Sequence, residues 1–105
     1  MNKYNAYYFF KNIEKKLKDN FTDSSVIVNE IYSFIQEDRS YDYLISFKNL
    51  EYLIYQSKNT SEINLNKITE CINILIVEIE NEISNMYKDY SYIEEKLRSI
   101  IFAIK

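Results

Sequence analysis

The sequence predicts an all-helical domain, and two observations lead to this prediction. The chain has 105 residues but no glycine and no proline, so tight β-hairpin turns lack the residues that they prefer. Apolar residues recur at intervals of three and four, which is the period of a helix with one buried face. We therefore expect one domain over residues 1–105, folded as an antiparallel bundle of about five helices.

The first three helices are expected over residues 3–18, 24–37 and 41–56. Each of these segments has one apolar stripe at helical spacing, and polar residues fill the other positions. The residues expected to face the core are Ala6, Phe9 or Phe10, Ile13, Leu17, Ile27, Ile31, Phe34, Ile35, Tyr43 or Leu44, Phe47, Leu50 and Ile54.

Residues that favour helix ends separate these segments. Asn20 is expected to end the first helix, because asparagine tolerates the left-handed conformation that often follows a helix. Thr22 or Asp23 is expected to cap the second helix and Ser40 the third. The polar residues 57–61 predict a linker.

The fourth helix is expected over residues 62–88, as a long element at the centre of the bundle. Residues 71–79 are apolar on nearly all sides, which is typical of a buried helix. The spacing of Ser91 and Glu94 forms a capping box and predicts the start of a fifth helix. Because its apolar residues continue to Ile104, we expect this last helix to dock on the core.

Composition also limits the class of function. The formal net charge is -3, with a basic first helix and an acidic body, whereas dedicated nucleic-acid binders are usually basic. No apolar run approaches the roughly 20 residues that span a bilayer, and the single cysteine fits a reducing compartment. We expect a cytoplasmic protein that does not bind membranes. Lys11, Lys15 and Lys18 share one face of the first helix and could contact phosphate, so a nucleic-acid-associated protein is a less favoured alternative. The abundance of isoleucine, asparagine, lysine and tyrosine indicates an AT-rich bacterial or mobile-element source.

The missing residue types argue against an enzyme. Without histidine the chain lacks the commonest general base and metal ligand, and without glycine it lacks phosphate-binding loops. Glu78 and Glu82 are spaced as a carboxylate pair, but we interpret them as part of a solvated acidic face. Cys71 is interpreted as a small buried hydrophobe. We therefore expect no catalytic residue, no cofactor and no metal site.

Two features point to protein binding. Tyr7, Tyr8 and the two phenylalanines that follow are consecutive, so a helix cannot turn all four rings toward one core. Acidic residues cluster around the turn between the second and third helices, and tyrosines near them fall largely off the inner stripes. The candidate partner-binding residues of this acidic, tyrosine-bearing face are Glu37, Asp38, Tyr41, Asp42, Tyr52 and Tyr55. Tyrosine is enriched in interface hot spots, although codon bias explains its abundance equally well.

In size, acidity and the absence of catalytic motifs, the chain resembles the small helical immunity proteins of bacteriocin and contact-dependent growth inhibition systems. The resemblance rests on no motif and transfers no residue roles. It implies a non-catalytic inhibitor that covers a basic toxin, such as a nuclease, with its acidic face. The alternatives are a phage-encoded anti-defence inhibitor and a helical oligomerisation or regulatory domain, in which aromatic residues of the first helix would lie between the subunits of a homodimer.

Overall fold

The computed structural model describes the backbone of residues 4–60 and 62–104, and side chains as far as residue 85. This part of the chain is helical, contains no strand, and has the elements α1 (Asn5–Asp19), α2 (Ser24–Glu37), α3 (Ile45–Thr60) and α4 (Leu65–Ile104). The all-helical prediction is therefore confirmed, but the number of helices is four and not five. None of these helices combines the length and hydropathy needed to cross a membrane.

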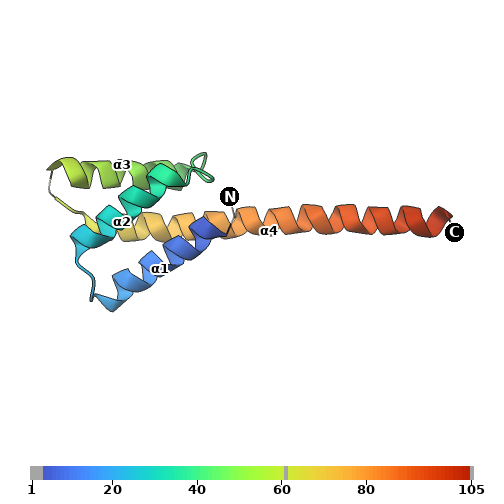
Figure 1. Cartoon of the computed structure of the whole chain (residues 1–105), viewed down its shortest axis with the longest axis horizontal. Coiled ribbons are helices and arrows are strands. Elements are labelled where there is room, and N and C mark those ends of the chain that lie inside the picture. The colour runs from blue at the N-terminus through green and yellow to red at the C-terminus, as the bar shows by residue number, and fades with distance from the viewer. Residues whose placement is uncertain (1–3, 61, 105) are drawn as a thin grey trace.

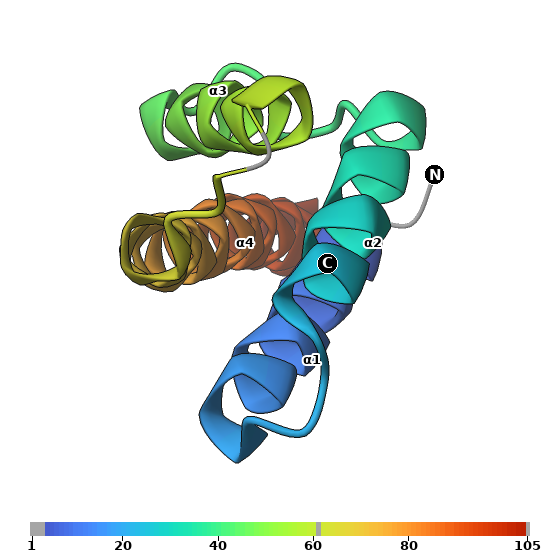
Figure 2. The same ribbon diagram turned by 90° about the vertical axis from the view of Figure 1, so that its left-hand side faces the viewer.

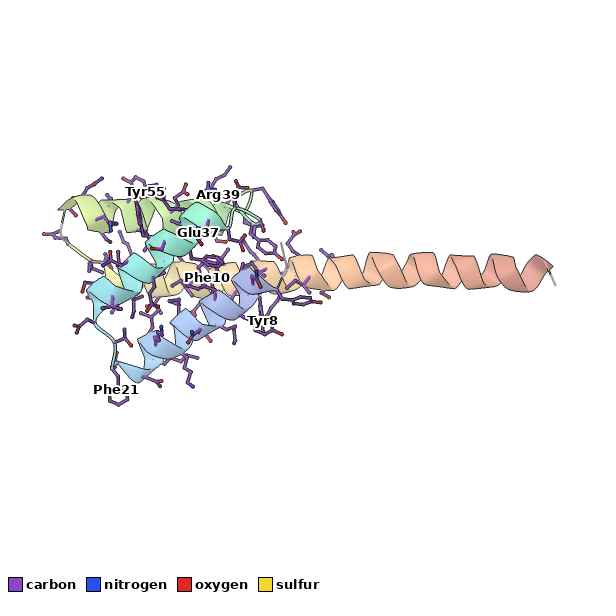
Figure 3. The ribbon with its side chains drawn as sticks, in the orientation of Figure 1. Tyr8, Phe10, Phe21, Glu37, Arg39 and Tyr55 are labelled. Carbon is purple, nitrogen blue, oxygen red and sulfur yellow. The ribbon has the colours of Figure 1, made fainter. Side chains whose placement is uncertain are left out.

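The end of α1 and the start of α2 lie close to the predicted positions. Asn20 has the left-handed conformation (φ 59°, ψ 18°) and turns the chain after α1. Asp23 stands at the N-cap of α2, where its carbonyl oxygen accepts the backbone N–H groups of Val26 and Ile27. The chain between α1 and α2 carries Phe21, whose side chain points away from the body of the protein (Figure 3).

The third helix begins and ends later than the sequence predicted. Residues 41–44 form turns, and Ser40 is not an N-cap: its backbone N–H donates instead to the carboxylate of Asp38 at 3.0 Å. The expected linker over residues 57–61 is wrong as far as Thr60, because α3 continues to that residue. There the hydroxyl groups of Ser57 and Thr60 donate to carbonyl oxygens one turn earlier, which satisfies these polar side chains within a helix.

One continuous helix replaces the predicted fourth and fifth helices. Asn64 caps α4 through its side-chain oxygen, which accepts the N–H of Lys67 at 3.2 Å. The helix then runs through Ser91 and Glu94, whose side chains lie outside the described part of the structure. No glycine or proline interrupts the segment, and extending a formed helix needs no new nucleus. The last helix therefore points away from the core instead of docking on it (Figure 1).

Helices α1 and α3 pack on the first half of α4, α2 packs against α3, and the four helices form a body with one core (Figure 1). The second half of α4 projects beyond this body and accounts for the longest dimension of the chain, 67 Å. In the body, α3 lies nearly along α4, and α1 and α2 cross α4 obliquely (Figure 1). The fully buried large side chains are Phe10, Phe47, Ile13, Ile27, Ile31, Ile35, Leu50, Ile54, Ile68, Ile72, Leu75 and Ile79.

The first half of α4 is buried on one side only. Figure 2, which looks down this helix, shows α1, α2 and α3 gathered around part of its circumference. Ile72 and Leu75 are fully buried, whereas Ile74 and Val77 are each 54% exposed on the opposite side. The expectation that residues 71–79 are buried all round is therefore wrong.

Polar contacts between helices lie at the edges of the core. The ammonium group of Lys16 on α1 lies 2.8 Å from the carboxylate of Glu30 on α2. The ammonium group of Lys58 on α3 donates to Asn29 of α2 at 2.9 Å and lies 4.4 Å from the centre of the Tyr32 ring. Partly exposed contacts of this kind contribute little energy, so packing of the apolar stripes holds the body together.

Replacement of a buried and an exposed isoleucine on the same helix tests this packing. Ile72→Ala should lower the free energy of unfolding by about 2–5 kcal/mol, because it leaves a cavity in the core. Ile74→Ala should change it by less than about 0.5 kcal/mol, because that side chain is half exposed. Urea denaturation followed by circular dichroism measures both values, and similar losses for the two variants would contradict the arrangement of α4.

Candidate functional site: an acid–tyrosine collar where α4 leaves the body

The turn between α2 and α3 does not form the acidic face that the sequence predicted. Asp38 is only 7% exposed, and its carboxylate accepts the N–H of Ser40. Tyr41 is 5% exposed and belongs to the hydrophobic core. Neither side chain is available to a partner, whereas Glu37 is exposed and the side chain of Asp42 is 45% exposed.

Arg39 neutralises much of the remaining acidic charge at this turn. Its guanidinium group pairs with the carboxylate of Glu51, and its Nε lies 3.5 Å from Asp42. It also donates to the carbonyl oxygen of Ile35 and lies 5.3 Å from the centre of the Phe47 ring. The hydrogen bond to Glu51 raises the pKa of Arg39. The turn is therefore a site of internal charge pairing, which weakens its attraction for a basic partner.

The predicted tyrosines lie in separate places. The rings of Tyr55 on α3 and Tyr32 on α2 meet edge to face, with their centres 5.7 Å apart. Tyr52 is exposed elsewhere on α3, beside Cys71 and Ile74 of α4. The structure therefore does not bring Tyr52 and Tyr55 together with Tyr7 and Tyr8.

Glu37 lines a shallow groove between α1 and α2, with a volume of about 530 Å³. Its apolar wall includes Phe9 and Phe34, whose rings are stacked with their centres 4.0 Å apart. Glu30, the other acidic residue of this groove, is already paired with Lys16. The groove consequently offers only one unpaired carboxylate, on Glu37.

A stronger concentration of acidic and tyrosine side chains encircles α4 where it leaves the body. From α1, the hydroxyl group of Tyr7 donates to the carboxylate of Glu80 at 3.3 Å. Just before α3, the hydroxyl group of Tyr43 donates to Glu82 at 2.8 Å. We call Tyr7, Tyr8, Tyr43, Glu80 and Glu82 the acid–tyrosine collar.

The geometry of the helix explains why tyrosines contact α4 on two opposite sides. Residues two apart on a helix differ by about 200° in direction, so Glu80 and Glu82 face opposite flanks. Glu78, one turn before Glu82, accepts the hydroxyl group of Ser46 at 2.5 Å and extends the flank that faces α3. Three carboxylates thus occupy five consecutive positions of α4.

The collar is open to solvent. Tyr8 is 65% exposed and Tyr43 is 54% exposed. Tyr8 lies at the end of the body from which α4 projects (Figure 3), and its ring meets that of Tyr7 edge to face at 5.5 Å. Tyr7, Tyr8 and Glu80 also line an open depression of about 400 Å³. Large aromatic side chains are therefore presented next to negative charge.

Within the described side chains, none of Glu78, Glu80 and Glu82 forms an ion pair with lysine or arginine. Lys11 is near Glu80, but it pairs with Glu14 at 3.3 Å. A carboxylate that accepts one hydroxyl group keeps further acceptor positions, enough for an arginine or lysine of another molecule.

Part of the collar was visible in the sequence. Tyr7 and Tyr8 were predicted partner-binding residues, because four consecutive rings cannot share one core. Glu78 and Glu82 were interpreted only as part of a solvated acidic face, and Tyr43 was weighed for the inner stripe. The packing of α1 and α3 on α4 brings these residues together, and no local pattern indicates which residues will meet.

The described residues do not suggest other chemistry. No group of three His, Cys, Asp or Glu side chains in this part of the chain is arranged to hold a metal ion. Cys71 is half-buried. Burial raises the pKa of its thiol, and the negative charge of the neighbouring Glu70 adds to this effect, so the thiol stays protonated.

The titration of Tyr43 tests the geometry of the collar. Partial burial and the hydrogen bond to Glu82 raise the pKa of Tyr43 to about 12, although the residue is 54% exposed. The folded state thus favours the neutral phenol, whereas an unfolded tyrosine ionises near pH 10. The contribution of this group to stability is complete below about pH 10 and is lost as the pH rises toward 12.

NMR titration of the tyrosine ring carbons should show one resonance, absent in Tyr43→Phe, that titrates near pH 12. Glu82→Gln should lower that pKa, because it removes the negative charge next to the hydroxyl group. A Tyr43 pKa that Glu82→Gln leaves unchanged would contradict the contact.

Comparison of the chain with protein-family models, with curated proteins and with solved structures gives no match.

Proposed function

We propose that the chain is a non-catalytic inhibitor that binds a basic protein through the acid–tyrosine collar. The observation that carries this proposal is the presence of two exposed tyrosines, Tyr8 and Tyr43, next to carboxylates without a cation partner among the described side chains. Tyrosine gives a large contact area and a hydroxyl group at little entropic cost, which makes it a frequent anchor in interfaces.

The charge of the collar favours a basic partner. Glu78, Glu80 and Glu82 produce a local negative potential that attracts positively charged surfaces and speeds association with them. The same charges repel phosphate groups, so this surface is not suited to nucleic acid. An inhibitor that covers the basic, nucleic-acid-binding surface of a toxic nuclease would have these properties.

The role that fits best is that of an immunity or antitoxin-type protein acting in the cytoplasm. Such a protein has to occlude a surface and needs no catalytic group. A chain without histidine or glycine is suited to that task, because it lacks the usual general base and the usual phosphate-binding loops.

Carbodiimide crosslinking, which joins carboxylates to lysines, tests this proposal. The full chain is used as bait in a lysate of cells that naturally encode it, and crosslinked peptides are identified by mass spectrometry. We expect one strongly basic protein to be recovered, with crosslinks from Glu80 or Glu82 to its lysines. Failure to recover a basic protein, or crosslinks to that protein only from other acidic residues, would refute the proposal.

Charge-reversed variants provide the matched comparison. Glu80→Lys combined with Glu82→Lys should lower recovery at least tenfold, because the partner then meets like charge. Glu62→Lys combined with Glu70→Lys makes the same change of charge on exposed residues outside the collar and should leave recovery nearly unchanged. Equal losses for the two pairs would show a dependence on net charge alone and would contradict a collar-specific site.

Truncation of Tyr8 tests the aromatic anchor separately. Tyr8→Ala should weaken binding of the recovered partner by about 2 kcal/mol, or about 30-fold, which is typical of a hot-spot residue. The variant should unfold like the parent chain, because the side chain is largely exposed. Titration calorimetry with the purified partner measures the affinity, and an unchanged affinity would remove Tyr8 from the interface.

A further inference from the structure

The half of α4 that projects from the body has no neighbour within the described chain (Figure 1). The contacts of Tyr7 and Tyr43 with Glu80 and Glu82, together with the packing of Ile83 on the core, mark the end of the body. About 20 residues of helix follow, which corresponds to about 30 Å. Helices of this length are marginal in water unless an apolar face is packed.

The sequence places an apolar stripe along this projecting half. Its members recur at intervals of three and four, and we call them the C-terminal stripe: Met86, Tyr90, Ile93, Leu97, Ile100 and Ile104. The same intervals of three and four connect the buried Ile68 to Met86 through other apolar residues of α4. From Ile68 to Ile104 there are ten intervals over 36 residues, an average of 3.6 residues for each interval. This equals the period of a straight α-helix, so the C-terminal stripe continues the face of α4 that α1 to α3 cover.

We propose that the C-terminal stripe pairs with the same stripe of a second copy of the chain, with the two α4 helices antiparallel. A symmetric dimer places one surface against an identical surface, so that surface has to be compatible with itself. Residues 86–104 contain three acidic and three basic residues and therefore have no net charge. Two copies can meet here without net repulsion, unlike two collars.

The position of the body determines the orientation. Helices α1 to α3 gather around part of the circumference of α4 (Figure 2), and the period of 3.6 residues places the C-terminal stripe on the same face of the helix. Two parallel chains with facing stripes would bring both bodies into the same space. Two antiparallel chains place the bodies at opposite ends, and residue 104 of one chain lies beside residue 86 of the other.

The expected affinity is modest. Six stripe residues and their flanking positions give about a dozen residues a side, fewer than the roughly 20–30 of a standard interface. We therefore expect a dissociation constant on the order of micromolar for the dimer.

Sedimentation equilibrium of the full chain between about 1 µM and 1 mM tests the dimer. The mass should rise from 12.7 kDa toward twice that value with increasing concentration. Leu97→Glu should weaken the dimer at least 30-fold, whereas Ser99→Glu, off the stripe, should weaken it less than threefold. A mass of 12.7 kDa at every concentration, a larger assembly, or equal effects of the two variants would overturn the proposal.

Disulfide trapping tests the orientation, in a Cys71→Ser background that leaves no other thiol. A mixture of Met86→Cys and Ile104→Cys chains should form a mixed disulfide dimer under mild oxidation. Ile104→Cys alone should not, because the antiparallel arrangement holds the two positions far apart. Crosslinking of Ile104→Cys with itself and not with Met86→Cys would indicate a parallel dimer and would contradict the proposal.

This pairing does not rest on the proposed inhibitor function. Leu97→Glu should weaken the dimer at least 30-fold without affecting capture of a basic partner at the collar. Glu80→Lys combined with Glu82→Lys should weaken that capture and leave the dimer unchanged. The two ideas can therefore fail separately.

Discussion

The apolar face of α4 is the element on which the rest of the structure depends. Its isoleucine and leucine side chains form the surface on which α1 and α3 pack, and α2 closes the core above them. Burial of apolar area is the main favourable term in folding, so this shared face determines where the body lies. The face continues beyond the body, and this continuation gives the chain its elongated shape (Figure 1).

Polar contacts lie at the edges of that apolar face. Hydroxyl groups from α1 and from the start of α3 reach carboxylates on the two flanks of α4 and fix the point where the helix leaves the body. The same contacts keep acidic oxygens at the surface beside aromatic rings. The packing of α1 and α3 on α4 thereby creates an acidic surface that carries exposed aromatic rings. Such a surface is expected to bind a basic protein.

The sequence predicts those features that depend on local patterns. Helix period identified most of the core residues, and Asn20 was correctly placed at the end of α1. The capping-box spacing of Ser91 and Glu94 was misleading, because a local start signal does not interrupt a helix whose apolar period continues through it. The burial of Tyr41 and Asp38, the pairing of Arg39, and the meeting of Tyr43 with Glu82 depend on how α2, α3 and α4 pack together, which local spacing does not determine.

The continuity of α4 is tested most directly by a distance measurement along it. Spin labels at positions 66 and 99, in a Cys71→Ser chain diluted with unlabelled protein, report the intramolecular distance by pulsed electron paramagnetic resonance. A continuous helix separates the two backbone positions by about 50 Å. A distance below about 35 Å would show that the helix breaks near Ser91 and folds back, and it would contradict both the projecting half of α4 and the dimer proposed from it.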